Sequence, residues 1–245
     1  MTTLVDTGTA GDPAANAPQR SEALQPHDLF VTRVIAACRN AGEQQALRHA
    51  LAKPVHEVPA RTHAVLLKPR PPEDDRHGGP DLPLVPYDVR DKRPFYAVAA
   101  LIAARPRAQR TDAVPPQDAE ETDLSASAAG AGHQGARKFR PNGTNLGESL
   151  ARAVTRGDDA IKEKGAEHKL HLMVRQDIDG LHRMLPSVVR LVSGTGVHVD
   201  YACLLRDLRS WPRYRDDVVT RWQESYYRTL GAERERAKAT KAEDR

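Results

Sequence analysis

Apolar side chains recur every three or four residues along much of the chain, and the clearest example begins after Val199. Asp200 stands just before it, where a carboxylate can accept hydrogen bonds from the free N–H groups of a first helical turn. Pro212 predicts the end of this helix, because proline lacks the N–H that continuation needs. The apolar stripe consists of Tyr201, Leu204, Leu205, Leu208 and Trp211.

A second stripe after Pro212 predicts a second helix in the last third of the chain. Its apolar face is formed by Tyr214, Val218, Val219, Trp222 and Tyr226. Because these stripes are predicted to face a core, the arginines around them are predicted to face water. Those arginines are Arg206, Arg209, Arg213, Arg215, Arg221 and Arg228.

Shorter periodic stretches predict further helices on the N-terminal side. One begins at Asp28, a second covers residues 41–53 and ends before Pro54, and a third covers residues 60–67. Residues 93–106 form the most hydrophobic stretch, and we expect this helix to lie centrally in a core.

On the C-terminal side we expect helices over residues 146–154 and 167–185, and another that starts at Pro186 and stops at Gly194. No stretch alternates as a strand would, and no internal repeat is present. The pattern therefore predicts an all-α fold of about eight or nine helices, packed as two small helical bundles.

Composition divides the chain into five parts. The first part lacks periodicity, and the third is rich in Ala, Ser, Gly, Pro and acidic residues, so both are predicted to be disordered. The predicted parts are a disordered tail (1–25), an N-terminal helical part (26–106), an acidic linker (107–136), a C-terminal helical bundle (137–230) and a charged tail that frays (231–245).

Charge is distributed unevenly among these parts. The whole chain is +4 with a pI of about 9.1, but residues 111–136 carry five acids and no base. Residues 26–110 are net +5 and residues 137–245 are net +6. Folded parts of this sign attract phosphate backbones or acidic membranes, whereas ordinary surface solvation is the alternative explanation.

The residue types of common active sites are present without the necessary arrangement. His168 and His171 share a helical face, but a zinc site needs three or four converging ligands. Asp216 and Asp217 are adjacent, so on a helix they point about 100° apart and cannot share one substrate. Gly194-Thr195-Gly196 lacks the strand and the Lys-Ser/Thr of a phosphate-binding loop. We therefore expect no enzyme, no metal and no cofactor.

Two cysteines, Cys38 and Cys203, form neither a disulfide framework nor a metal pattern. The N-terminus has no apolar run typical of a signal peptide, and no segment approaches the 18 apolar residues of a membrane span. The sequence thus predicts a cytoplasmic protein without a membrane partner.

Basic side chains on several predicted helices remain as the candidate functional residues. If the fold gathers some of them on one face, that face would follow a phosphate backbone without reading bases. The candidates are Arg48, Lys53, Arg137, Lys138, Arg140, Arg152, Lys169, Arg175, Arg190 and Arg206.

Four blocks of sequence resemble a known family. They are ALRHALAKP (46–54), FYAVAALIAARP (95–106), TNLGESLARAV (144–154) and the long stretch 167–228, which includes PSVVRLV and VDYACLLRDLRSW. The chain resembles the CasB family, the small subunit of the type I-E CRISPR surveillance complex Cascade. The likeness covers about residues 28–106 and 137–230.

The resemblance implies a non-catalytic helical protein that sits in the complex as a pair of copies. Its partners would be other Cascade subunits, the CRISPR RNA and target DNA, including the displaced strand, which it would hold so that the R-loop stays open. It implies phosphate contacts at Arg48, Lys169, Arg175, Arg190 and Arg206. A helical DNA-binding regulator and a purely structural scaffold are the alternatives that the residues themselves leave open.

Overall fold

The computed structural model describes residues 21–71, 81–106, 142–156 and 161–243. Within these residues the chain forms eight α-helices and one short 3-10 helix, and the only β-type pairing is a single bridge between Arg70 and Leu82. The predicted all-α fold is confirmed. The helices are α1 (Gln25–Ala37), α2 (Ala41–Arg48), α3 (Ala60–Leu67), α4 (Arg93–Ala104), α6 (Leu146–Val154), α7 (Glu163–Val174), α8 (Ile178–Gly194) and α9 (Tyr201–Glu243), with η2 at Val55–Glu57.

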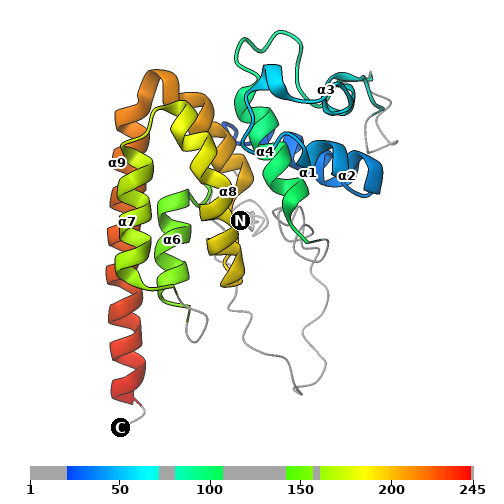
Figure 1. Cartoon of the computed structure of the whole chain (residues 1–245). Coiled ribbons are helices and arrows are strands. Elements are labelled where there is room, and N and C mark those ends of the chain that lie inside the picture. Colours follow the sequence, from blue (N-terminus) through cyan, green and yellow to red (C-terminus); the bar gives the residue numbers. More distant parts are fainter. Residues whose placement is uncertain (1–20, 72–80, 107–141, 157–160, 244–245) are drawn as a thin grey trace, which may run out of the picture.

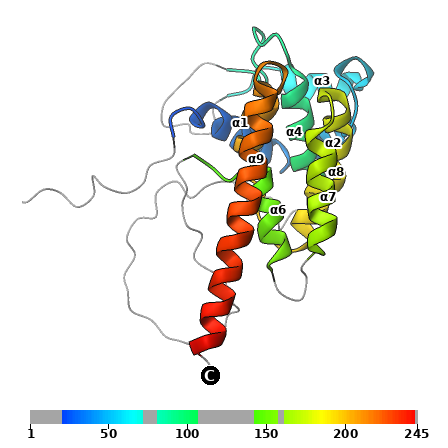
Figure 2. The same cartoon turned by 90° about the vertical axis from the view of Figure 1, so that its left-hand side faces the viewer.

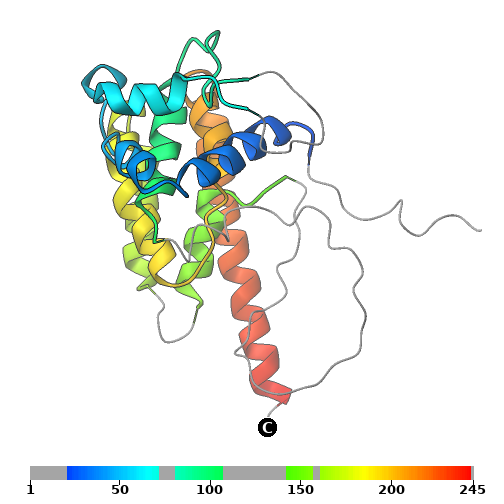
Figure 3. The same ribbon diagram turned by 90° about the vertical axis from the view of Figure 1, so that its right-hand side faces the viewer.

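The helices form two neighbouring groups, with α1 to α4 on one side and α6 to α9 on the other (Figure 1). The longest helix, α9, packs against α6, and its C-terminal end extends beyond the other helices (Figure 2). Helix α1 lies across α9 and joins the two groups (Figure 3). One hydrophobic core runs continuously through both groups.

Helix α4 lies at the centre, as its hydrophobicity predicts. It packs against α1 and α2 in its own group and against α8 and α9 in the other. Most of its side chains are buried, including Phe95, Tyr96 and Ile102. The ring of Phe95 meets that of Phe30 from α1 edge to face, with centroids 5.1 Å apart. A helix that is apolar all round must be covered on every side, which explains why four helices surround it.

The tightest packing in the described part of the molecule joins α6 to α9. A Cβ placed on Gly147 would lie only 1.9 Å from the backbone oxygen of Trp222. The backbones approach this closely because residue 147 has no side chain. Asn145 caps the start of α6 by accepting from the Glu148 N–H at 3.0 Å, and its own amide donates to Ser225 Oγ on α9 at 2.8 Å.

The connection into α6 is tied to the start of α9. Asp200 caps α9 as predicted, accepting from the Cys203 N–H at 2.9 Å, and its second oxygen accepts from the Thr144 N–H at 3.1 Å. Gly143 adopts φ +76°, a conformation that favours glycine. This explains why a glycine follows Asn142 in the predicted turn. Leu24, which the sequence assigns to the disordered tail, is fully buried beside Gly143.

The predicted division between the helices of residues 167–194 is wrong. Helix α7 ends at Val174, and α8 starts at Ile178, where Asp177 accepts from the Gly180 N–H at 2.7 Å. Pro186 lies inside α8 instead of at its start. The apolar face of α8 continues past the proline, and burying that face outweighs the cost of one lost hydrogen bond. The face includes Leu181, Leu185, Val188 and Val192, all buried.

The end of the chain forms two helices, as predicted, but their junction lies at Tyr214 instead of Pro212. The φ of −129° and ψ of 37° at Tyr214 are not helical, and the label α9 covers the two helices that meet there. Tyr214 is 58% exposed, so it does not belong to the buried stripe of the following helix. The second of these helices ends at Glu243. Pairs of oppositely charged side chains three residues apart, such as Glu233 with Arg236, stabilise this exposed end.

The α6–α9 contact generates a stability prediction. Replacing Gly147 by alanine forces the two helices apart, and we expect a loss of about 3 kcal/mol or more in the free energy of unfolding. Gly165 in α7 is the matched control, because nothing lies within 4 Å of the position that an added Cβ would take there. Gly165→Ala should be neutral or stabilising by up to about 1 kcal/mol. Urea denaturation of both variants measures the difference, and equal stabilities would contradict the close packing.

Candidate nucleic-acid interface

The solvent side of α8 carries two arginines one above the other. Because Leu181, Leu185 and Val188 turn the opposite side inward, Arg183 and Arg190 fall on the exposed side. The positions between and after them on this side, Ser187 and Gly194, are also exposed, and both are small. Seven residues of helix separate the two arginines by about 10 Å along the axis. This side of α8 is therefore open to an elongated anion.

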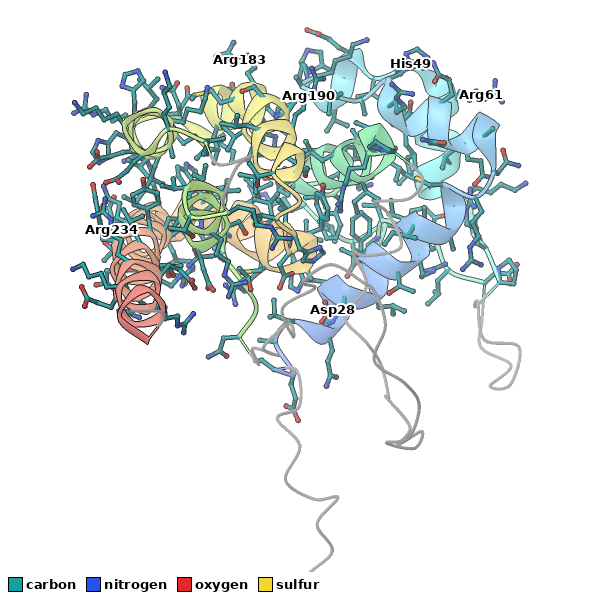
Figure 4. The ribbon with its side chains drawn as sticks, turned by 90° about the horizontal axis from the view of Figure 1, so that it is seen from below. Asp28, His49, Arg61, Arg183, Arg190 and Arg234 are labelled. Carbon is teal, nitrogen blue, oxygen red and sulfur yellow. The ribbon has the colours of Figure 1, made fainter. Side chains whose placement is uncertain are left out.

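Basic groups from the other helical group lie on the same side of the molecule. His49 follows α2 and Arg61 lies in the first turn of α3, and both project along the same edge as Arg183 and Arg190 (Figure 4). Asp28 of α1 projects from the opposite edge (Figure 4). We call the set Arg61, Arg183, Arg190 and His49 the basic face.

The acidic groups near these helices are largely engaged elsewhere. Asp179 at the start of α8 pairs with Arg93 of α4, and Glu43 of α2 pairs with Arg70 at 2.8 Å. Among the residues that the structure describes, the guanidinium groups of Arg61, Arg183 and Arg190 have no carboxylate partner. Their charge is consequently available to a ligand, although salt screens exposed charges beyond about 10 Å.

A second group of arginines surrounds a buried carboxylate instead. Asp207 is completely buried in α9 and accepts from Trp222 Nε1 at 2.7 Å, from Arg206 Nη2 at 3.1 Å and from Arg221 Nη2 at 3.3 Å. Arg206 also donates to the backbone oxygen of Asn142 at 3.3 Å. A buried charge is tolerated only when it is paired and hydrogen-bonded, so these contacts satisfy Asp207 from inside the protein.

The ten candidate residues of the sequence are thus separated by the fold. Arg190 lies on the basic face, and Arg48 and Lys53 are exposed within five residues of His49 in sequence. Arg175 is exposed at the C-terminal cap of α7, and Lys169 is half-buried on the same helix. Their contacts with nucleic acid stay predictions.

Two candidates have internal partners, and three lie outside the described residues. Arg152 pairs with the buried carboxylate of Glu148 at 2.6 Å, and Arg206 joins the Asp207 cluster. Arg137, Lys138 and Arg140 fall outside the residues that the structure describes.

Three members of the basic face, Arg183, Arg61 and His49, are not among the candidates predicted from the sequence. The spacing of seven between Arg183 and Arg190 is visible in the sequence. Assigning Pro186 to a helix start, however, places the two arginines on different helices and conceals that they share one side.

Comparison with known proteins identifies the family. The family model for CRISPR-associated protein Cse2 matches residues 44–227 of the chain. The chain belongs to the Cse2 family. This confirms the resemblance to the small Cascade subunit, and the Cse2 match spans the helices that carry Arg61, Arg183 and Arg190. No curated protein sequence matches the chain significantly.

Solved structures agree with the Cse2 assignment. A chain of a structure described as a CRISPR RNA-guided surveillance complex is 30% identical, with a TM-score of 0.62 over 88% of this chain and 99% of that one. A chain of a pre-nicking surveillance complex is 32% identical, with a TM-score of 0.62 over 87% of this chain and 98% of that one. The crystal structure of M. ruber CasB, at 20% identity and a TM-score of 0.54 over 84% and 96% of the two chains, shows the same fold.

Metal sites and membrane spans are two other features that this Cse2 chain could carry. Across residues 21–71, 81–106, 142–156 and 161–243, no group of three or more His, Cys, Asp or Glu side chains is arranged to hold a metal ion. None of the helices in that part is both long and apolar enough to cross a membrane.

The Asp207 cluster of this Cse2 chain generates a second prediction. Asp207→Ala leaves Trp222 Nε1 and two guanidinium groups without their acceptor, so we expect unfolding to become easier by about 3 kcal/mol. Asp216→Ala is the matched control, because the Asp216 side chain is 97% exposed. Thermal denaturation compares the two. A small loss for Asp207→Ala, equal to that of Asp216→Ala, would show that the cluster does not stabilise the fold.

A buried histidine on α8 predicts how the stability of the protein depends on pH. His182 of α8 is 3% exposed, and burial, followed by the nearby charge of Arg93, lowers its pKa to about 4 from 6.5. The unfolded chain therefore takes up this proton first as the pH falls, and stability decreases from about pH 6.5 to about pH 4. His27, with its pKa also lowered to about 4 by burial and Arg209, acts in the same direction.

The slope of the free energy of unfolding against pH tests the contribution of His182. Urea denaturation between pH 7.5 and 5 should show a smaller loss for His182→Gln than for the unmodified chain. Ser187→Ala, at an exposed position on α8 that carries no titratable group, should leave the slope unchanged. Identical slopes for all three proteins would mean that His182 does not titrate as its burial predicts.

Proposed function

We propose that this chain is a non-catalytic subunit of a type I-E CRISPR surveillance complex and that its basic face contacts the phosphate backbone of nucleic acid there. The contacts would include the displaced DNA strand and would stabilise the R-loop. One observation carries the proposal: Arg183 and Arg190 share the solvent side of α8 and have no carboxylate partner among the described residues, and Arg61 projects along the same edge.

The physical basis is the energy balance of the R-loop. The RNA–DNA duplex that forms is about as stable as the DNA duplex that it replaces, so contacts to the freed backbone can decide the outcome. Arginine suits this task because its planar guanidinium binds phosphate oxygens in pairs. A backbone contact of this kind needs no base-reading side chain. This fits the small residue Ser187, which lies between Arg183 and Arg190 on the exposed side of α8.

The partners proposed for the chain follow from the family and from its relatives. The two relatives at 30% and 32% identity come from RNA-guided surveillance complexes. We therefore propose that the other Cascade subunits, the CRISPR RNA, the target DNA and a second copy of the chain are its partners. A cytoplasmic location is part of this proposal.

A helical DNA-binding regulator is less well supported. Such a protein would need a recognition helix with exposed base-reading side chains. The turn that the sequence offers for such a motif, residues 193–196, precedes α9. The first turns of α9 are buried, including Tyr201, Leu204 and Leu205. That helix cannot enter a groove without unpacking the core.

Charge reversal tests the proposed surface. In the complex reassembled around an Arg183→Glu, Arg190→Glu double variant, we expect the R-loop to dissociate about tenfold faster or more, because two charge-assisted phosphate contacts are lost. The salt dependence of DNA binding should also become shallower by about one unit of slope for each contact removed. Arg228→Glu on α9, which makes the same charge change at a side chain paired with Glu224, is the matched control.

The outcome separates the proposal from a purely structural role. An unchanged R-loop lifetime and an unchanged salt slope, in a double variant that still enters the complex, would overturn the basic face as a nucleic-acid surface. Equal losses in the double variant and in Arg228→Glu would show an effect of total charge instead of position.

A further inference from the structure

We infer that Tyr214, at the interruption of α9, is a stacking site for an unpaired base of single-stranded nucleic acid. The inference rests on the proposed function and deepens it, because it names the part of the nucleotide that this subunit contacts besides phosphate. It concerns a different part of the molecule from the basic face.

The exposure of Tyr214 is unlike that of the other exposed tyrosines. Tyr87 is 59% exposed, but its hydroxyl donates to the Leu67 carbonyl at 2.7 Å. Tyr227 is 46% exposed, but its hydroxyl donates to Glu167 Oε1 at 2.7 Å and lies 3.1 Å from His171 Nε2. Tyr214 is 58% exposed, and its ring and hydroxyl make no contact of this kind with any residue that the structure describes. No hydrogen bond or ring contact with a described residue therefore accounts for the orientation of Tyr214.

The backbone presents this ring at a fixed place. The non-helical φ and ψ of Tyr214 separate the two halves of α9, so the ring is not packed along a continuous helical surface. Arg215, the next residue, anchors the segment: its Nη2 donates to the Val174 carbonyl at the end of α7 at 2.6 Å, and its guanidinium lies 5.9 Å from the centre of the Trp211 ring. A ring held on an anchored segment loses little conformational freedom when it stacks.

Two cationic residues are chain neighbours of the residues that form this junction. Arg213 precedes Tyr214 and is exposed, and Arg175, directly after Val174, is exposed at the end of α7. Neither has a carboxylate partner among the described residues. Asp216 and Asp217 follow in the first turn of the second half of α9, and Asp216 lies 3.8 Å from Arg215. These two carboxylates repel phosphate at the junction. The attraction for a nucleotide at this place is therefore stacking of its base on the tyrosine ring.

An exposed aromatic ring on a segment that also carries exposed arginines suits the binding of unpaired bases. Every base has a flat face, so stacking works on any sequence, and the arginines hold the flanking backbone. A paired base is covered by its neighbours in the duplex and offers no such face. The site is accordingly selective for single-stranded nucleic acid without selecting a sequence.

Two oligonucleotides of equal charge test the inference with the full chain. The first is an oligothymidylate and the second is the same length of abasic backbone. The unmodified chain should bind the oligothymidylate about fivefold more tightly or better, and Tyr214→Ala should remove this difference while leaving the abasic affinity unchanged. Tyr214→Phe and Tyr214→Trp should retain it. Tyr87→Ala is the matched control at an equally exposed tyrosine and should retain it too.

Each contrary outcome has a distinct meaning. Equal, salt-dependent binding of both oligonucleotides by the unmodified chain would overturn base stacking and leave the basic face standing. Failure to bind either one would overturn the proposed nucleic-acid surface and this inference with it. A Tyr214→Ala variant that keeps the preference but no longer enters the complex would overturn stacking and assign Tyr214 to a protein contact instead.

Discussion

The hydrogen bond from the Trp222 indole to the Asp207 carboxylate fixes the geometry on which much of this protein depends. Asp207 lies in the first half of α9 and Trp222 in the second, so a 2.7 Å bond spans the interruption at Tyr214. Both side chains are completely buried. Without this bond, a helix broken in the middle could adopt a range of angles. With it, the second half of α9 is held where α6 can pack against the backbone of Trp222.

Internal hydrogen bonds of this kind explain why several arginines of α9 are unsuited to binding phosphate. Arg206 and Arg221 are held by Asp207, and Arg215 is held by the Val174 carbonyl. A guanidinium that satisfies a buried carboxylate cannot leave it without exposing an unpaired charge inside the protein. The two exposed arginines of α8, Arg183 and Arg190, are not bound in this way to any described carboxylate. Chemically identical side chains therefore differ in what they can bind, because their neighbours differ in burial and charge.

The two proposed contacts use different parts of a nucleotide. The basic face offers charge along an elongated path on α8 and beside α3 (Figure 4). The junction of α7 with α9, in contrast, offers one aromatic ring. Neither surface reads the identity of a base. That combination suits a subunit whose complex leaves sequence recognition to base pairing between guide and target.

Periodicity and capping are local properties, so the sequence alone was enough to predict the all-α class and the cap at Asp200. The turn at Gly143 also follows from local sequence. The hydrophobicity of α4 predicted its central place, and four sequence blocks predicted the family. The sequence pattern misplaced the α7–α8 boundary and Tyr214, where tertiary packing overrides local rules. Burial of one apolar face carries α8 through Pro186, and Tyr214 lies exposed at the junction of the two helices of α9 instead of in the buried stripe. Which arginines are free could be learned only from the folded chain, since the partner of a charge is set by neighbours distant in sequence. Arg206 turns to an internal carboxylate, whereas Arg183 joins Arg190 on an open face.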